Sequence, residues 1–184
     1  MSDDGCAPYL PAREDVKNTY MDPQYIPDGD YTIVQIKQGS LESNVCEAWT
    51  PILRDVFSIY EGFRVNHEAD IQGQKIDMEV YRMKNHLRLN FFALVLKRYS
   101  YLNSDQALEN AETQLKGHLE SLGNTQEGRL WGALCIGKSV QFYQCSKGSG
   151  KPELFALHDG MLRIDRQPQT LKQWLQHIRS NVMS

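Results

Sequence analysis

Several familiar sequence signals are missing from this chain of 184 residues. Its four cysteines, Cys6, Cys46, Cys135 and Cys145, form no CxxC pair and have no histidine at zinc-finger spacing, so we expect free, buried thiols. No apolar run reaches the roughly 20 residues of a membrane span. The N-terminal stretch MSDDGCAPYLPARED is acidic and lacks the apolar region of a signal peptide. We therefore expect an intracellular protein, cytoplasmic or nuclear, with no membrane partner.

An excess of basic residues is also missing. The chain has 20 lysines and arginines against 23 aspartates and glutamates, a formal net charge of -3. Indiscriminate binding to polyanions needs a net basic surface, so this balance argues against it and leaves only a local basic cleft open. With 41% hydrophobic residues, the chain has enough apolar material for the core of one domain.

The first part of the chain divides into an arm and the start of a domain. Residues 1–29 are rich in proline, aspartate and glycine, which predicts an extended N-terminal arm, and residues 30–184 form the single domain. The run Tyr-Thr-Ile-Val-Gln-Ile at residues 31–36 is a candidate for a short strand, which Gly39 ends. Apolar residues then recur at three and four positions as far as Tyr60, which predicts a helix capped by Ser40 or Ser43 and ended by Gly62.

A β-hairpin and a buried strand follow. Residues 63–71 and 75–83 flank Gln72-Gly73-Gln74, a pattern typical of a hairpin. In the second arm of this hairpin one face is apolar and the other carries Asp77 and Glu79. Residues 91–96 are continuously apolar, so we expect the segment Leu89 to Lys97 to be a central strand covered on both faces.

The remaining elements complete a mixed fold. A helix is expected from Asn103 or Ser104 to Leu122, followed by a hairpin of residues 130–136 and 139–144 and a further pair of strands, 153–157 and 161–164. Thr170 and Gln173 form the capping box of a final helix. The expected fold class is α/β (α+β): one domain with an αβββαβ core, a mixed central sheet flanked by helices, and a C-terminal hairpin and helix.

This order of elements, with Asp77 on the second strand and Lys97 at the end of the third, resembles the PD-(D/E)XK nuclease superfamily. The resemblance covers a little over half of the chain. It implies that an aspartate and an acid-x-Lys pair hold a divalent metal, which activates water to attack a phosphodiester. On this pattern Asp77 is the first acid and Lys97 the lysine, but Val95 stands where the second acid belongs.

The same resemblance suggests further site residues. Glu79 shares the polar face of Asp77 and is the candidate for a displaced metal ligand. Glu47 is placed like the glutamate of the first helix, and Gln114 or Gln106 like the glutamine of the second. The candidate catalytic set is therefore Asp77, Glu79, Lys97 and Gln114, with Mg²⁺ or Mn²⁺ at Asp77 and Glu79 if the protein is an active nuclease.

Candidate binding residues lie beside these positions. A basic stretch of Arg82, Lys84, His86 and Arg88 and the neighbouring Arg98 are placed to meet a phosphate backbone, and Tyr99 and Tyr101 to stack on bases. A solvated hairpin turn is the favoured explanation of the basic stretch, and ordinary packing explains the tyrosines equally well. Residues 132–139 also satisfy the G-x₄-G-K-S pattern of a phosphate loop, but the interior is strand-like and no helix follows, so we expect a hairpin there.

Three functions remain open from the sequence. The first is a non-catalytic binding or scaffold protein on a nuclease-like fold, which has lost its metal site, needs no cofactor and binds another protein. The second is an active metal-dependent nuclease that uses Asp77, Glu79 and Lys97. The third is a small-molecule enzyme on the same fold. Nucleic acid as a partner and a homodimer formed through hairpin edges also remain open.

Overall fold

The computed structural model describes residues 10–71, 74–122, 129–146 and 153–183. Four α-helices and seven strands are present in these residues, together with two short 3₁₀ helices. In chain order they are α1 (Tyr31–Gln35), α2 (Glu42–Val56), η1 (Ile59–Glu61), β1 (Phe63–Ile71), β2 (Gln74–Lys84), β3 (Leu87–Lys97), η2 (Tyr99–Asn103), α3 (Asp105–Ser121), β4 (Arg129–Ile136), β5 (Ser139–Ser146), β6 (Glu153–Ala156), β7 (Leu162–Arg163) and α4 (Pro168–Met183). The predicted order helix, three strands, helix, strand holds from α2 to β4.

The strands form one mixed sheet in the order β1-β2-β3-β4-β5-β6, and β7 pairs with β5. Strands β1, β2 and β3 pair antiparallel in chain order. The predicted turn at Gln72 and Gly73 lies outside the residues that the structure describes. Strands β3 and β4 are parallel, because helix α3 carries the chain back across the sheet between them. The carboxyl ends of β3 and β4 therefore lie at the same edge of the sheet, a place where α/β proteins commonly bind ligands.

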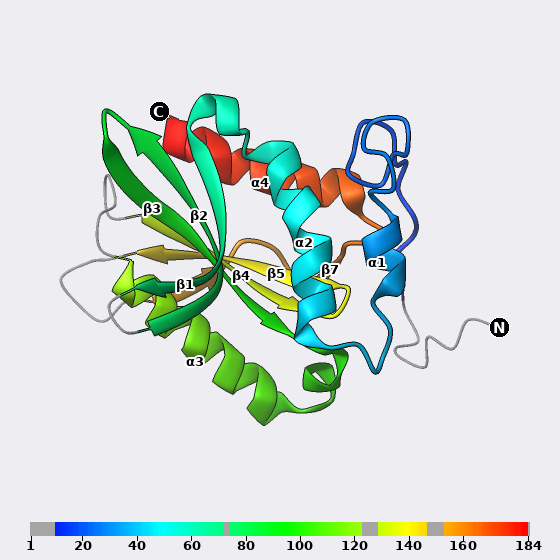
Figure 1. Cartoon of the computed structure of the whole chain (residues 1–184). Coiled ribbons are helices and arrows are strands. Elements are labelled where there is room, and N and C mark those ends of the chain that lie inside the picture. Colours follow the sequence, from blue (N-terminus) through cyan, green and yellow to red (C-terminus); the bar gives the residue numbers. More distant parts are fainter. Residues whose placement is uncertain (1–9, 72–73, 123–128, 147–152, 184) are drawn as a thin grey trace.

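Helices cover both faces of the sheet (Figure 1). Helices α2 and α4 lie over one face, and α3 lies over the other. Each face has its own apolar core. One joins α2 and α4 to residues such as Phe92 and Leu94, and the other joins α3 to Ala93 and Val95. The expected α/β class, one domain with a mixed sheet flanked by helices, is confirmed.

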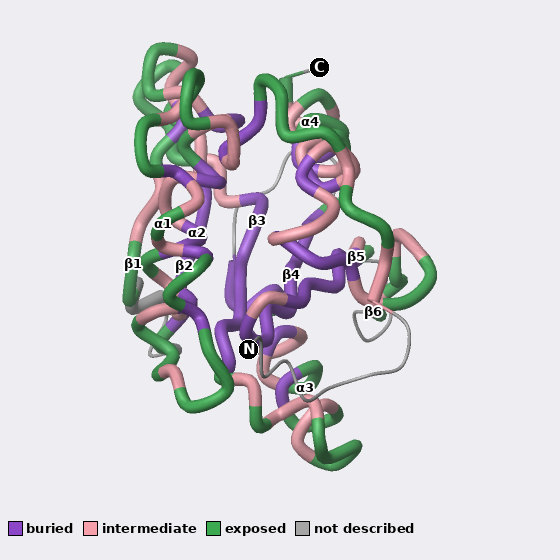
Figure 2. The backbone as a smooth tube through the Cα atoms, turned by 90° about the vertical axis from the view of Figure 1, so that its right-hand side faces the viewer, coloured by how far each residue is buried: buried purple, intermediate pink, exposed green. Residues whose placement is uncertain are grey.

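Strand β3 occupies the centre of the domain, as its sequence predicts. All residues from Phe91 to Lys97 are buried, whichever face of the sheet they point to. Figure 2 shows this buried backbone running along β3 and β4, with exposed chain around it. Among the described residues, no helix has the length and apolar character needed to cross a membrane.

The sequence prediction is wrong for residues 31–36. Tyr31 to Gln35 form the short helix α1, not a strand. The physical reason lies in what is buried: Ile33 and Ile36, three residues apart, are both inside the core, while Tyr31 and Val34 are exposed. A spacing of three places side chains on one face of a helix, whereas a strand would place them on opposite faces.

Two predicted helix ends also differ from the structure. Helix α2 ends at Val56 rather than at Gly62, and Gly62, with φ +89°, ends η1 instead. Helix α4 begins at Pro168, two residues before the predicted cap Thr170. Proline is well suited to the first helical turn because it has no N–H to leave unsatisfied there.

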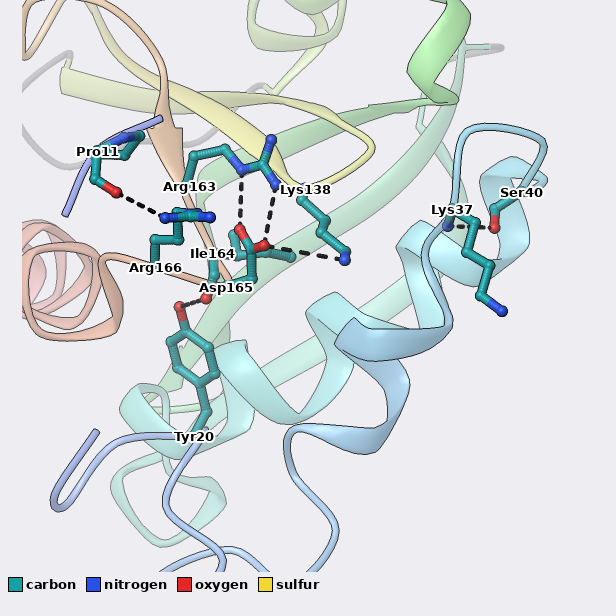
Figure 3. Close-up of polar contacts among 9 residues, drawn as sticks. All are labelled: Pro11, Tyr20, Lys37, Ser40, Lys138, Arg163, Ile164, Asp165 and Arg166. Carbon is teal, nitrogen blue, oxygen red and sulfur yellow. Dashed lines mark hydrogen bonds and ion pairs between the residues drawn. The ribbon is translucent and has the colours of Figure 1, made fainter. Parts of the chain in front are cut away.

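The N-terminal arm, in its described part, packs against the C-terminal half of the chain. The carboxylate of Glu14 accepts hydrogen bonds from the backbone N–H groups of Gln169 (2.9 Å) and Thr170 (3.0 Å) and so caps α4. The buried Tyr20 donates its hydroxyl to the carbonyl of Ile164 at 2.7 Å, as Figure 3 shows.

Candidate functional site

Asp77 lies where the β1–β2 hairpin leaves the rest of the sheet. The pairing of β2 with β3 begins at Met78, opposite Leu94, so the β2 residues from Gln74 to Asp77 form no backbone ladder pair with β3. The Oδ2 atom of Asp77 accepts the backbone N–H of Leu96 at 2.9 Å. We use the name notch for the residues at this divergence, Asp77 of β2 and Lys97 of β3, together with His118 of α3, whose pKa both of them influence. Figure 1 shows β1 and β2 turning away from the end of β3 here.

Lys97, the last residue of β3, directly follows the Leu96 that Asp77 contacts. Its side chain is only 11% exposed and lies 3.8 Å from the carboxylate of Glu42, at the start of α2. The ammonium also lies 5.7 Å from the centre of the Tyr101 ring. Val95, two residues earlier, is fully buried in the core against α3. Apolar packing therefore surrounds the position where the sequence resemblance expects an acid.

His118 of helix α3 is a third group at the notch, and the sequence did not single it out. It is 3% exposed, and its Nδ1 atom is buried with no hydrogen-bond partner. Burial lowers the pKa of His118; the charge of Asp77 opposes this shift and the charge of Lys97 adds to it. A hydrogen bond between His118 and the backbone of Lys75 also opposes the shift, so burial is the cause that lowers this pKa most.

The predicted glutamine lies one helical turn away from this histidine. Gln114 is half-buried on α3, and residues four apart share a face of a helix, so Gln114 and His118 form one stripe. Gln106 is exposed and donates its side-chain amide to Asn110, so it belongs to the solvent face of α3. Between the two candidate glutamines, Gln114 is therefore the one that shares a face with the notch histidine.

A thiol and an imidazole meet between α2 and β1. The Sγ atom of Cys46 lies 3.1 Å from Nδ1 of His67, and Nε2 of the same ring lies 3.4 Å from Oγ1 of Thr50. Thr50 gives its own proton to the carbonyl of Cys46, so its oxygen is left to accept from His67. This arrangement assigns the ring proton to Nε2 and leaves Nδ1 to accept the thiol proton of Cys46.

The surroundings of Cys46 oppose thiolate formation. Burial raises the pKa of the Cys46 thiol, and the charges of Asp77, Glu68 and Glu47 raise it further. A reactive cysteine needs the opposite environment, with nearby positive charge that stabilises the thiolate. The pair resembles a nucleophile and its base in distance alone, and its electrostatics keep the sulfur protonated.

Glu79 is not available to the notch in the way the sequence suggested. It is 0% exposed and forms an ion pair with Arg88, while Asn66 donates to the same oxygen, Oε1, at 3.1 Å. Arg88 in turn lies 4.0 Å over the ring of Tyr81. Oε2 is buried without a partner. The carboxylate is thus neutralised by a cation of the chain itself.

The predicted binding residues fall at two ends of the molecule. Arg98 is exposed beside Lys97, Glu47 is exposed on α2, and Tyr99 packs against Gly137. Lys84 and Arg88 lie at the opposite end of β3, about 30 Å away at about 3.3 Å per residue.

Arg82 has a structural environment. It donates to the carbonyls of Val182 at 3.3 Å and Glu61 at 3.4 Å, which ties β2 to the end of α4 and to η1. The predicted basic stretch is therefore not one continuous surface with Lys97.

A second charged cluster borders the edge of the sheet. The turn between β4 and β5 lies beside the end of β3, because Gly137 donates its N–H to the carbonyl of Lys97 at 2.9 Å. Asp165 accepts two hydrogen bonds from Arg163, at 2.9 and 3.0 Å, and lies 4.0 Å from Lys138 (Figure 3). Burial raises the pKa of Asp165, but Arg163 and Lys138 outweigh this, so the pKa is lowered. The glycine-lysine-serine sequence is a hairpin turn, as predicted.

Asp77 and Glu79 do not fit a two-carboxylate Mg²⁺ site. One oxygen of Asp77 is taken by the N–H of Leu96, Glu79 is held by Arg88 and Asn66, and Val95 offers only methyl groups. Mg²⁺ requires several oxygen ligands in near-octahedral geometry. In the residues that the structure describes, no group of three or more His, Cys, Asp or Glu side chains is arranged to hold a metal.

No protein-family model matches the chain, and no curated protein or solved structure is significantly similar to it. The function therefore has to be argued from the chain's own residues. At the notch they form a mostly buried arrangement of one carboxylate, one lysine and one neutral histidine, in which the carboxylate and the lysine already have partners within the chain.

Proposed function

We propose that this chain is a non-catalytic binding or scaffold protein on a nuclease-like fold, with another protein as its partner. The observation that carries the proposal is Val95. It is fully buried against α3 at the position where the resemblance places the second metal-binding acid. A carboxylate at that position would lie in the buried apolar cluster that includes Ala93 and Leu115, where an unpaired charge is strongly unfavourable.

The other groups at the notch support the same proposal. Asp77 ties β2 to β3, and Lys97 lies between Glu42 and Tyr101. These contacts give both residues a structural role that needs no substrate. The net charge of -3 adds weak support, since a negatively charged chain and a nucleic acid repel each other overall.

One observation favours the alternative, a metal-dependent nuclease. Asp77 and Lys97 both influence His118, so the aspartate and lysine of the family pattern border one small region. An imidazole nitrogen without a partner at this place is a possible ligand that the sequence pattern did not include. The two functions make opposite predictions for cleavage.

The deciding experiment is a cleavage assay. Purified chain is titrated with Mg²⁺ and with Mn²⁺ in the presence of single- and double-stranded DNA and RNA. We expect no cleavage. Metal-dependent cleavage that is lost in Asp77→Asn and in Lys97→Met, and is kept in the exposed-site control Glu109→Gln, would overturn the proposal. Asp77→Asn is preferred to alanine because its amide oxygen still accepts from Leu96, so a loss of activity would not reflect unfolding.

A further inference from the structure

The strand order of the sheet runs from β1 to β6, so each of these two strands has a ladder partner on one side only among the described residues. Figure 2 shows β1 and β6 at opposite sides of the molecule. The free edge of a strand is a template for pairing with another chain, and proteins commonly protect it with charged side chains or an irregular backbone. The two edges differ in this protection.

The β1 edge is protected. Glu68 has a φ of +49°, which interrupts the regular strand conformation. Arg64 and Glu68 are both exposed and charged. The guanidinium of Arg64 also donates to the carbonyl of Phe63 at 2.7 Å and so takes up a backbone acceptor of the strand itself. Pairing of another chain along β1 is therefore unfavourable.

Strand β6 lacks this protection. Of its residues, Glu153, Leu154, Phe155 and Ala156, only the first is charged, and none has a positive φ angle. Phe155 is 52% exposed, and Ala156 is exposed beside it. An uncharged edge strand with an exposed aromatic side chain is a surface that readily pairs with another strand.

The hydrogen bonds between β5 and β6 show which backbone groups of β6 face outward. Leu157, directly after β6, donates its N–H to the carbonyl of Phe142 on β5 at 2.9 Å. In an antiparallel ladder, residues whose backbone faces the partner strand alternate with residues whose backbone faces away. The backbone of Phe155 therefore also faces β5, whereas Leu154 and Ala156 turn their N–H and C=O groups outward. Within the described part of the chain these outward groups have no hydrogen-bond partner.

The spacing of the outward groups fits a second copy of the same strand. When two β6 strands lie antiparallel with Leu154 opposite Ala156 of the second copy, each such pair exchanges both of its backbone hydrogen bonds. The two-fold axis then passes beside Phe155, and the Phe155 side chains of the two copies lie on the same face with their Cα atoms about 4.5 Å apart. Aromatic pairs of this kind stabilise a sheet, and no like charges oppose each other at the axis.

Helix α3 leaves room for this arrangement. It packs on β3 and β4, and a hollow of about 330 Å³ separates it from β6, with Glu112, Lys116 and Leu154 in its lining. In the joined sheet the β4 strands of the two copies are five strand spacings apart, about 24 Å at about 4.8 Å each. Two helices of about 10–12 Å diameter fit side by side over that distance.

We propose that two copies of this chain pair through β6 in this antiparallel register, so that one sheet continues across the two-fold axis. The inference goes beyond the proposed function, because the partner is a second copy and not a different protein. A second copy presents its strand already ordered, whereas a flexible segment of another protein loses entropy when it becomes a strand. Since only Leu154 and Ala156 offer backbone groups, we expect a weak, reversible dimer.

Sedimentation equilibrium of the full chain tests this association. From micromolar to millimolar concentration, the average mass should rise from 21.2 kDa toward twice that value. Ala156→Pro removes an outward N–H, and Phe155→Lys places two ammonium groups side by side, so each should weaken the dimer at least about tenfold. The control Tyr31→Lys makes the same kind of change at an aromatic residue that is 61% exposed on α1 and should leave the dimer unchanged. Urea unfolding verifies that each variant is folded.

Cysteine cross-linking tests the register. In a Cys6→Ser, Cys46→Ser background, Phe155→Cys brings the two new thiols to the axis, where the Cα separation suits a disulfide. The control Glu153→Cys is also exposed and on the same strand, but its two copies are about 14 Å apart along the strand direction, at about 3.4 Å per residue. With copper phenanthroline as the oxidant, we expect a covalent dimer of Phe155→Cys and none of Glu153→Cys.

Three results would overturn the proposal: a constant mass of 21.2 kDa at all concentrations, a dimer that is undiminished in both Phe155→Lys and Ala156→Pro, or equal cross-linking of the two cysteine variants. A monomer that instead binds a peptide of about six alternating valines and threonines, and loses it in Ala156→Pro, would also overturn it and assign the edge to extended segments of other proteins. These readouts are independent of nucleic-acid cleavage, so failure of the dimer and failure of the non-catalytic function can be told apart.

Discussion

The carboxylate of Asp77 takes the place of a backbone carbonyl for the N–H of Leu96, at 2.9 Å, where β2 has already separated from β3. A buried N–H without a partner is unfavourable, so this side chain allows the β1–β2 hairpin to diverge without leaving Leu96 unsatisfied. The residue most like a catalytic acid in the sequence therefore has a structural role in the folded chain.

Removal of this acceptor should destabilise the domain. We expect Asp77→Ala to lower the free energy of unfolding by about 1–3 kcal/mol, because it leaves the N–H of Leu96 buried and unpaired. Asp77→Asn should lose less stability, since its amide oxygen can still accept the hydrogen bond from the N–H of Leu96. Urea unfolding of both variants measures the difference, with Glu109→Ala on the exposed face of α3 as the control. Equal stability of Asp77→Ala and the native chain would show that the bond contributes nothing.

Cys46 should react slowly with alkylating agents at neutral pH. Its pKa is raised by burial first and then by Asp77, Glu68 and Glu47, and a higher pKa means a smaller thiolate fraction at any given pH. In a Cys6→Ser background, Cys46 is the only cysteine of the described residues that is not buried. Iodoacetamide kinetics followed by mass spectrometry should give a pH midpoint above that of a free thiol.

Neutralising a nearby carboxylate should reverse part of this effect. Asp77→Asn or Glu47→Gln should move the midpoint of the Cys46 reaction to lower pH, because each removes a negative charge that disfavours the thiolate. Glu109→Gln on α3 is not among the carboxylates that raise this pKa and should leave the midpoint in place. An unchanged midpoint in Asp77→Asn would show that the charge of Asp77 does not influence the Cys46 thiol.

The ring of His118 should stay neutral below the pH at which an ordinary histidine gains a proton. Its pKa is lowered in the folded state, mainly by burial, so the unfolded chain binds the proton more readily. The stability linked to His118 is therefore fully present above about pH 6.5 and is lost as the pH falls through the lower folded value. NMR titration of the ring measures this pKa directly.

The two neighbours of His118 should shift its pKa in opposite directions. Lys97→Met removes a positive charge that lowers the pKa and should raise it, whereas Asp77→Asn removes a negative charge and should lower it further. His158, whose pKa is also lowered by burial, has neither residue among its influences and should be unaffected by both changes. Shifts of the same sign in the two variants would contradict the geometry of the notch.

Replacing Gly137 with alanine should destabilise the domain much more than replacing Gly160. Both have positive φ angles, +54° and +64°, so alanine is strained at either position by about 1–2 kcal/mol. A Cβ at Gly137 would also lie 2.4 Å from the Tyr99 ring, whereas nothing lies within 4 Å at Gly160. In urea unfolding, we expect Gly137→Ala to lower the free energy of unfolding by about 1–3 kcal/mol more than Gly160→Ala does, the usual cost of overpacking. Recovery in a Gly137→Ala, Tyr99→Ala double variant would locate the clash.

The sequence predicts most of the fold because its patterns are local and strong. The alternation of β2, the continuous apolar run of β3 and the glycine-containing turn between β4 and β5 are each local signals of an element or of its pairing. The error at α1 arises because five residues are too few for a helical period to outweigh the strand preference of Tyr31, Ile33 and Val34. Burial of Ile33 and Ile36 by the rest of the domain decides the conformation.

The site is less predictable, because its residues meet only in three dimensions. Asp77 and Lys97 are found through an ordered pattern, but His118 reaches them from α3, and no spacing in the sequence relates it to either. Cys46 and His67 are 21 residues apart and lie on different elements. Alternation places Glu79 on a polar face, but it does not reveal that Asn66 and Arg88 enclose it there.

The cap on helix α4 has a consequence for how the chain is made. Glu14 is synthesised 155 residues before Gln169, whose N–H it accepts, and the whole sheet from β1 to β7 is translated in that interval. Contacts between residues so far apart form late and slow folding, because the intervening chain must be ordered first. The arm therefore leaves the ribosome before every strand of the sheet and is fixed in place after them, so a pause in translation before α4 would leave a formed sheet with the arm still undocked.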